Sequence, residues 1–154
     1  FPQYHFDMVR LGIGLHGISA THANLQPVSS FKTYISSIRE VPEGQSIGYG
    51  RKSYTTRPSR IAVIPVGYAD GLNRHLSNRV GNVFIKGKRV PIIGNICMDT
   101  CMIDVTDTNA AIGDEVEIFG KHILVSELSE QLGTIPYEIL TGISHRVKRV
   151  YYKE

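Results

Sequence analysis

The chain has 154 residues, with 17 Lys and Arg against 14 Asp and Glu, which gives a formal net charge of +3. Hydrophobic residues make up 42% of the chain and charged residues 20%, which argues against a disordered protein and predicts one folded domain with at most part of a second. The charge is spread along the chain and the apolar runs are short, which argues against a nucleic-acid-binding protein and against a membrane-spanning helix.

The cysteines and histidines indicate neither a disulfide nor a metal site. Cys97 and Cys101 are four positions apart, and in a strand this spacing spans about 13 Å, beyond the reach of a disulfide. The six histidines lack the spacing of metal ligands. We therefore expect two reduced thiols, no bound metal, no secretory leader and a cytoplasmic location.

The first residues differ in pattern from the rest. Residues 7–17 (DMVRLGIGLHG) are predicted to form a strand that runs into three glycines, and residues 21–26 to form a connector. Because the sequence begins with Phe1, we expect it to start inside a longer reading frame or after processing. Residues 1–26 are accordingly predicted to be the end of a preceding domain with its connector, and residues 27–154 a second domain.

Short strands dominate the middle of the chain. Residues 82–93 (NVFIKGKRVPII) are typical of a hairpin with a Lys-Gly-Lys turn. Pro65 cannot donate to a strand ladder, so its strand is expected to bend, end or lie at an edge there. Alternation of apolar and polar residues, or a high content of β-branched and aromatic residues, predicts further strands over residues 30–41, 60–66, 97–105 and 115–119.

Helix signals come late in the sequence. Ser126 is a candidate N-cap for a helix that stops at Gly133, and Pro136 is placed to open a second short helix that continues to Leu140. Residues 146–152 (RVKRVYY) are predicted to end the chain as a strand whose basic side chains form a solvated face. Many closely spaced strands with one or two short helices predict a mainly β fold, a small barrel or sandwich. The expected fold class is the barrel-like form.

Two glycine-containing motifs in the first third of the chain could carry chemistry. In residues 10–14 (RLGIG), glycines after a strand let backbone N–H groups approach an anion, and Arg10 adds a permanent charge with a fixed donor fork. The alternative is a glycine-rich turn with a surface arginine. In residues 48–50 (GYG), flanking glycines leave Tyr49 exposed, where nearby positive charge could make it an acid or a base. The alternative there is an aromatic plug over a turn.

Two further motifs follow predicted strands. Residues 67–71 (GYADG) come directly after a strand, at a position where functional residues are common. The alternative is a turn in which Asp70 caps its own backbone. In residues 95–99 (NICMD), Asp99 lies among apolar neighbours and needs partners if it is buried. The alternative is a strand with an aspartate at its edge.

Together, in this order and at these spacings, the motifs resemble alanine racemase, a fold-type III enzyme that uses pyridoxal phosphate. The resemblance corresponds to the C-terminal part of that family, whose members have an N-terminal (β/α)8 barrel followed by a mainly β domain. It implies that this chain holds the last barrel strand, a connector and the β domain. It covers almost the whole chain and rests on residues 9–17 (VRLGIGLHG), 48–50 (GYG), 64–71 (IPVGYADG), 91–99 (PIIGNICMD), 113–120 (GDEVEIFG) and 143–151 (ISHRVKRVY).

The resemblance implies roles in cofactor binding and catalysis. Arg10 matches the arginine that contacts the pyridine nitrogen of pyridoxal phosphate, and Gly12 and Ile13 match backbone donors to its phosphate. Tyr49 matches the catalytic tyrosine, which takes or gives the Cα proton on one face of the substrate, while the cofactor lysine of the barrel serves the other face. His145 stands where some relatives place a tyrosine that bonds the phosphate, and it could still donate a hydrogen bond.

The resemblance also implies contacts with the substrate. Met98 matches the residue whose backbone N–H helps to hold the substrate carboxylate, and Asp99 supports that loop. Asn95 stands where many relatives carry an arginine at the substrate entryway. The remaining matches lie near the same entryway, the first of them being also a substrate contact: Tyr68, Asp70, Arg74 and Ile143.

The activity implied is interconversion of L- and D-alanine, for bacterial cell-wall synthesis, by a two-base mechanism. In the family the tyrosine serves the barrel of the other subunit in a head-to-tail homodimer, and the cofactor lysine comes from the barrel, so the chain alone is expected to be inactive. Two alternatives remain, a racemase for serine or a broader range of amino acids, and a non-catalytic small-β-barrel binding module. The aromatic residues are scattered and not clustered in basic strands, which disfavours nucleic acid as a ligand of such a module.

Overall fold

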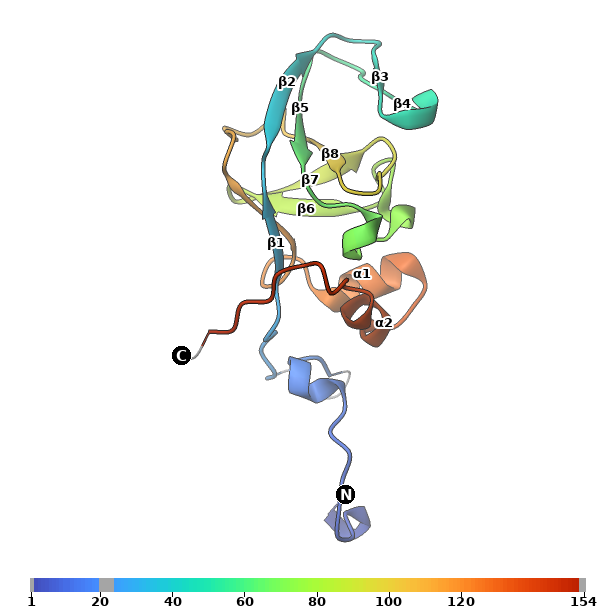
Figure 1. Cartoon of the computed structure of the whole chain (residues 1–154), viewed down its shortest axis with the longest axis vertical. Coiled ribbons are helices and arrows are strands. Elements are labelled where there is room, and N and C mark those ends of the chain that lie inside the picture. The colour runs from blue at the N-terminus through green and yellow to red at the C-terminus, as the bar shows by residue number, and fades with distance from the viewer. Residues whose placement is uncertain (1, 20–23, 153–154) are drawn as a thin grey trace.

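The computed structural model describes residues 2–19 and 24–152 (Figure 1), so residues 21–23 of the expected connector lie outside the described residues. Within those residues, seven strands form one sheet in the order β1-β9-β6-β7-β8-β5-β2, and two short strands form a separate hairpin. The sheet contains β1 (Phe31–Tyr34), β2 (Ser37–Val41), β5 (Ser59–Ile64), β6 (Asn82–Ile85), β7 (Lys88–Ile93), β8 (Cys101–Asp104) and β9 (Glu115–Phe119), and the hairpin contains β3 (Ser46–Ile47) and β4 (Ser53–Tyr54).

A continuous stretch of chain closes this sheet into a barrel. Strands β1 and β2 lie at opposite edges of the sheet, yet only Ile35 and Ser36 separate them. The Ile35 N–H donates to the Asp114 carbonyl oxygen beside β9 at 3.0 Å, and the Ser36 N–H donates to the Val63 carbonyl oxygen of β5 at 2.9 Å. One bent segment therefore bonds to both edges, and the predicted mainly β, barrel-like fold class is confirmed.

The barrel interior is filled by aliphatic side chains. Val83, Ile92, Ile103 and Val105 have no exposed surface, and Ile92 of β7 pairs with Ile103 of β8. A smaller apolar cluster of Ile47, Ile61 and Ile93 lies apart from this core. Because Ile47 belongs to β3, this second cluster attaches the β3–β4 hairpin to strands β5 and β7 of the barrel.

Several local predictions are confirmed. The hairpin β6–β7 turns at Lys86 and Gly87, which both have positive φ (47° and 79°), as the tightest hairpin turns require. Strand β5 ends at Ile64, directly before Pro65. Strand β9 has the predicted bounds.

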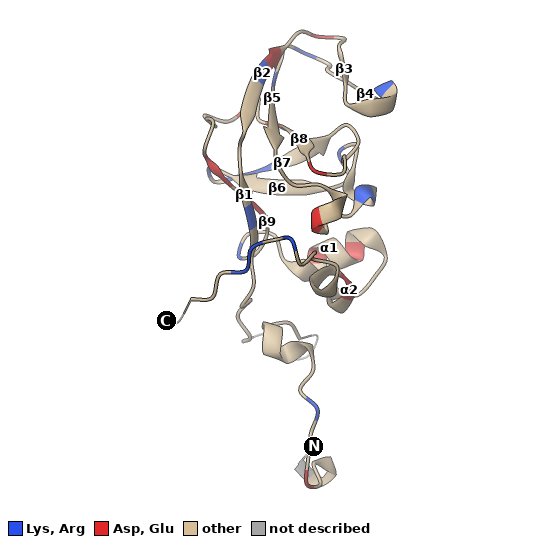
Figure 2. Ribbon diagram, viewed as in Figure 1, with Lys and Arg blue, Asp and Glu red and all other residues tan. Residues whose placement is uncertain are grey.

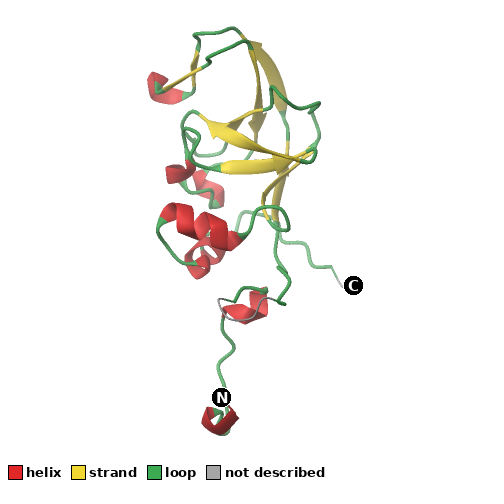
Figure 3. Ribbon diagram, turned by 180° about the vertical axis from the view of Figure 1, so that it is seen from behind, coloured by secondary structure: helices red, strands yellow, loops and turns green. Residues whose placement is uncertain are grey.

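Helices α1 (Val125–Leu132) and α2 (Pro136–Thr141) follow the strands and lie together beneath the sheet, toward one side of it (Figure 3). Gly133 ends α1 in the left-handed conformation and Pro136 opens α2, both as predicted. The N-cap of α1 is Leu124 and not Ser126, because the Glu127 carboxylate accepts the Leu124 N–H at 3.1 Å and closes the first turn two residues earlier.

Two predicted strands are wrong. Residues 7–17 are not a strand in the described chain: residues 7–12 are exposed and the 3₁₀ helix η2 covers Ile13–His16. A strand needs a neighbouring strand for its backbone hydrogen bonds, and the described residues offer none here. Residues 146–152 are likewise not a strand: the segment begins with a turn, in which the Val147 N–H donates to the Ser144 carbonyl oxygen at 3.1 Å, and its remaining residues are irregular.

Two other strands are shorter than predicted. The strand expected over residues 97–105 starts only at Cys101, because residues 97–100 form a turn in which the Cys97 N–H donates to the Thr100 carbonyl oxygen at 2.9 Å. The distance argument for the cysteines therefore does not hold, although both are free thiols. The strand expected over residues 30–41 breaks at the bend that closes the barrel, where its alternation is imperfect.

Candidate active site

Tyr49 lies at the tip of the β3–β4 hairpin, in the 3₁₀ turn η3 (Tyr49–Arg51). Gly48, Gly50 and Arg51 have φ values of 75°, 78° and 48°. The two glycines adopt this region freely, whereas an arginine in it is uncommon. The Tyr49 side chain is 77% exposed and so points away from the barrel. The sequence therefore places a phenol on a sharply constrained turn, with its hydroxyl open to a partner.

The turn formed by residues 95–99 makes hydrogen bonds to the other segments that carry predicted substrate residues. The side-chain amide of Asn95 donates to the Tyr49 carbonyl oxygen at 2.7 Å. Further along the turn, the carbonyl oxygens of Cys97 and Met98 accept the N–H groups of Tyr68 and Ala69, both at 3.0 Å. The motif GYG, the motif GYADG and the motif NICMD, far apart in the sequence, thus meet on one side of the barrel.

Gly67 is required for the contact between two of these segments. A Cβ atom at Gly67 would lie 2.3 Å from the carbonyl oxygens of both Cys97 and Met98, closer than real side chains allow. The glycine lets the two backbones approach and leaves the side chains of Tyr68 and Met98 about half exposed beside each other's loop.

Asp70 connects the C-terminal segment around Arg146 to this group of residues. It lies in the 3₁₀ turn η4 (Tyr68–Asp70), and one carboxylate oxygen accepts the Gly67 N–H at 2.9 Å, the self-capping expected from sequence. The other oxygen accepts from Arg146 Nε at 2.7 Å, and Nη2 of the same guanidinium donates to Asp99 at 2.6 Å. Arg146 therefore bridges the two carboxylates.

Burial of Asp70 acts to raise its pKa, but the hydrogen bonds from Arg146 and from the Gly67 N–H outweigh burial, and the pKa of Asp70 is lowered. The carboxylates of Asp70 and Asp99 raise the pKa of Arg146 in turn. The Asp99 carboxylate is thus partnered although its side chain is 60% exposed. Sequence reasoning missed Arg146, which was interpreted as part of a solvated face, because its partners lie 76 and 47 positions away.

The other predicted entryway residues lie around this group. Ile143 packs against the barrel core, and Gly71 adopts φ of +108° where a Cβ would lie 2.9 Å from Ile143 Cα. Arg74 is exposed in the turn η5 (Arg74–Leu76). Asn95 is 9% exposed, so its side chain points inward.

The predicted cofactor residues lie elsewhere. Arg10 and Gly12 are exposed in the N-terminal segment, which leaves the barrel at the end opposite the β3–β4 hairpin (Figure 1), and Ile13 is half-buried there. A Cβ atom at Gly12 would lie 3.1 Å from the hydroxyl oxygen of Tyr137 on α2. His145 is exposed after α2. The structure therefore does not bring Arg10, Gly12 or Ile13 to Tyr49 within one chain.

The described residues show no concentrated basic surface, no cluster of metal-ligating side chains and no membrane-spanning helix. Lys and Arg are distributed over the strands, the β3–β4 hairpin and the C-terminal segment (Figure 2). Across residues 2–19 and 24–152, no three His, Cys, Asp or Glu side chains come together as they would to hold a metal. None of the helices in the described part of the chain is long and apolar enough to cross a membrane.

Comparison with known proteins gives one consistent family. The sequence model described as "Alanine racemase, C-terminal domain" matches residues 28–151. Alanine racemase 2 of Caldanaerobacter subterraneus subsp. tengcongensis is 50% identical over 157 residues, which covers 96% of this chain and 40% of that protein. The chain spans about two fifths of the length of the curated relatives it matches.

Solved structures agree in fold. The alanine racemase of Bartonella henselae, with covalently bound pyridoxal phosphate, superposes with a TM-score of 0.89 at 39% identity and covers 95% of this chain and 42% of that one. The alanine racemase of Bacillus anthracis, with bound L-Ala-P, superposes with a TM-score of 0.86 at 36% identity and covers 92% of this chain and 39% of that one.

Proposed function

The chain belongs to the alanine racemase family as its C-terminal domain, and we propose that in the full-length protein it serves the interconversion of L- and D-alanine. The observation that carries this proposal is the placement of Tyr49. Its phenol stands exposed on a constrained turn, and the 95–99 turn joins it to the segments of Tyr68, Met98 and Asp70. The Bacillus anthracis relative was solved with bound L-Ala-P, which supports an alanine-like substrate.

Tyr49 would act as the acid or base on one face of the substrate carbon. Inversion at a carbon requires that a proton leave from one face and that a proton arrive at the other, so two groups on opposite faces are needed. The turn that carries Tyr49 would fix where its hydroxyl stands, and the backbone N–H of Met98 would hold the substrate carboxylate. Tyr68, Asp70, Arg74, Asn95 and Ile143 would line the route by which the substrate reaches them.

Arg10, Gly12 and Ile13 fit a phosphorylated pyridine cofactor by the chemistry of their donors. Gly12 precedes the first turn of η2, where backbone N–H groups have no acceptor inside the helix, and Arg10 is exposed two residues earlier. These N–H groups would hold the phosphate, with His145 as a further donor. The Arg10 guanidinium, which keeps its proton, would donate to the pyridine nitrogen and leave it unprotonated. Pyridoxal phosphate, when bound, would withdraw electrons and weaken the Cα–H bond.

The positions of these groups support a shared active site. The β3–β4 hairpin, which carries Tyr49, and the N-terminal segment, which carries Arg10, lie at opposite ends of the molecule (Figure 1), so one copy cannot bring both residues to the same substrate. A head-to-tail pair of chains can bring both residues to one substrate, with the β3–β4 hairpin of one copy placed over the N-terminal segment of the other. We infer that residues 1–26 are the end of a barrel and its connector and that the working protein is a homodimer.

The test of this function is racemisation by the full-length protein that carries this chain. We expect formation of D-alanine from L-alanine, with kcat/KM for alanine above that for serine by roughly 10–100-fold, the range expected where a pocket discriminates by one added hydroxyl. Preference for serine would favour the alternative racemase. The proposal would be overturned if the full-length protein racemised neither alanine nor serine.

The 154-residue chain by itself is expected to bind pyridoxal phosphate poorly. None of its lysines stands in the family context of the lysine that bonds the cofactor, so only weak, reversible contacts would remain. Gel filtration of the chain after incubation with the cofactor checks this through the absorbance that elutes with the protein, with the full-length protein as positive control. Retention of one cofactor per chain by the isolated chain would contradict the expectation.

A further inference from the structure

The turn that carries Tyr49 is supported from the barrel by one buried side chain. Asn95 Nδ2 donates to the Tyr49 carbonyl oxygen at 2.7 Å, and Asn95 Oδ1 accepts from Asn78 Nδ2 at 3.0 Å. A carbonyl oxygen can only accept, so the atom of Asn95 that faces Tyr49 must be the amide nitrogen. Both ends of the Asn95 carboxamide are therefore used, and its orientation is fixed.

The same network returns to the hairpin on its other strand. Asn78 Oδ1 accepts from the Ser53 hydroxyl at 2.8 Å, and the Ser53 oxygen in turn accepts the Gly94 N–H at 3.3 Å. Ser53 belongs to β4, so the residues on both sides of the turn are bonded to the segment around Asn95. Asn78 itself has φ of 56°, a left-handed conformation that asparagine tolerates better than most residues.

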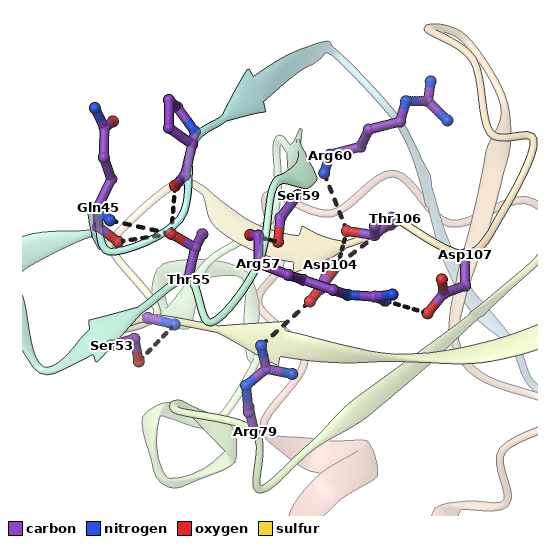
Figure 4. Close-up of polar contacts among 12 residues, drawn as sticks. Gln45, Ser53, Thr55, Arg57, Ser59, Arg60, Arg79, Asp104, Thr106 and Asp107 are labelled. Carbon is purple, nitrogen blue, oxygen red and sulfur yellow. Dashed lines mark hydrogen bonds and ion pairs between the residues drawn. The ribbon is translucent and has the colours of Figure 1, made fainter.

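The hairpin needs this support. Strands β3 and β4 have two residues each, too few to hold a hairpin by their own hydrogen bonds. The stem is fixed at its base by Thr55, whose hydroxyl donates to Pro42 and accepts the Gln45 N–H, as Figure 4 shows for Gln45 and Thr55. The tip includes Arg51 in the left-handed region, a costly conformation that persists only where surrounding contacts impose it.

We propose that Asn95 is a positioning residue for catalysis: its carboxamide, oriented by Asn78, fixes the main chain of Tyr49 and thereby the place of the phenolic oxygen against the substrate Cα. The proposal rests on the proposed function, in which Tyr49 is an acid or base. It adds a role to the position predicted at the substrate entryway. A carboxylate at position 95 would have nearly the same volume, yet it would place an acceptor against the Tyr49 carbonyl oxygen.

The test uses Asn95→Asp in the full-length protein, with Asn109→Asp as control because Asn109 is exposed in the loop before β9. Exchange of the alanine Cα proton with solvent deuterium is measured from each enantiomer, together with kcat, KM and cofactor absorbance. We expect Asn95→Asp to lower kcat by about 10–100-fold, the cost of a misplaced catalytic group, with KM changed by less than about threefold. The loss of exchange should fall on the same enantiomer as in Tyr49→Phe.

A double variant separates positioning from general damage. If Asn95 acts through Tyr49, then Asn95→Asp should cost much less in a Tyr49→Phe background, because the group that it positions is already gone. Additive losses, equal losses from both enantiomers or behaviour like Asn109→Asp would each overturn the inference. Should Asn95→Asp fail to fold, Asn78→Ala removes the donor that orients Asn95 and is judged by the same criteria. Wild-type exchange in Tyr49→Phe would instead overturn the proposed function itself.

Discussion

Replacement of Tyr49 by Phe in the full-length protein is expected to abolish most Cα proton exchange from one enantiomer of alanine. The substitution removes one hydroxyl and leaves the ring and the turn in place. Loss of a general acid or base costs about 10²–10⁴-fold in rate, and in a two-base reaction it falls on the face that this group serves. The exchange is measured in deuterated solvent, starting from L-alanine and, separately, from D-alanine.

The matched control for this variant is Tyr34→Phe. Tyr34 is exposed on β1, and β1 contains none of the three motifs of the site. The same chemical change there should therefore leave proton exchange from both enantiomers at the wild-type rate. Cofactor absorbance should be retained in both variants. If Tyr49→Phe exchanges protons from both enantiomers at wild-type rates, Tyr49 is an exposed tyrosine that takes no part in proton transfer, and the two-base assignment fails.

Much of the fold could be predicted because it depends on local chemistry. The β6–β7 turn needs residues that tolerate positive φ, and a Lys-Gly pair between two apolar runs signals this directly. Pro65 ends its strand because it has no backbone N–H to donate, and Gly133 ends its helix because glycine adopts the left-handed conformation freely. The closure of the barrel is harder to predict from sequence. It depends on the backbone hydrogen bonds that Ile35 and Ser36 make to distant segments on either side of the bend.

The failed predictions concern segments whose structure depends on distant partners. Residues 7–17 have a strand-like pattern, but a strand forms only beside a neighbouring strand, and the described residues include none beside this segment. The basic pattern of residues 146–152 gave no hint that Arg146 joins two carboxylates. Asn95 likewise bonds to a residue 46 positions earlier, a contact that no local pattern reveals.

The two supports found only in the structure act on the same turn from different ends. Asn95 begins the 95–99 turn and holds the hairpin of Tyr49, whereas Asp99 ends it and is held by Arg146. Between them, Met98 receives the N–H of Ala69 on its carbonyl oxygen and keeps its side chain half exposed. A substrate carboxylate held at this turn would therefore have a fixed distance to the phenol of Tyr49, which is what proton transfer requires.

Replacement of Arg146 by Met is expected to loosen this arrangement and to make the domain less stable in a pH-dependent way. The variant keeps an aliphatic stem but leaves Asp70 and Asp99 without their shared cation. In the full-length protein we expect kcat/KM for alanine to fall by on the order of 10–100-fold as the turn loses its fixed position. Arg39→Met, on an exposed position of β2, is the control and should leave kcat/KM near the wild-type value.

The pH dependence follows from the pKa of Asp70. Because that pKa is lowered in the folded chain, the Asp70 contribution to stability is present above the ordinary aspartate value of about 4 and is lost as the pH falls through the folded value. Without Arg146, of the groups that lower the pKa of Asp70 only the Gly67 N–H remains, while burial still acts to raise it. Thermal unfolding of the 154-residue chain should therefore show Arg146→Met melting several degrees below wild type at pH 7. That difference should narrow below about pH 4. A difference of the same size at pH 7 and pH 3 would mean that Arg146 stabilises the domain by packing alone and that its ion pair with Asp70 contributes nothing.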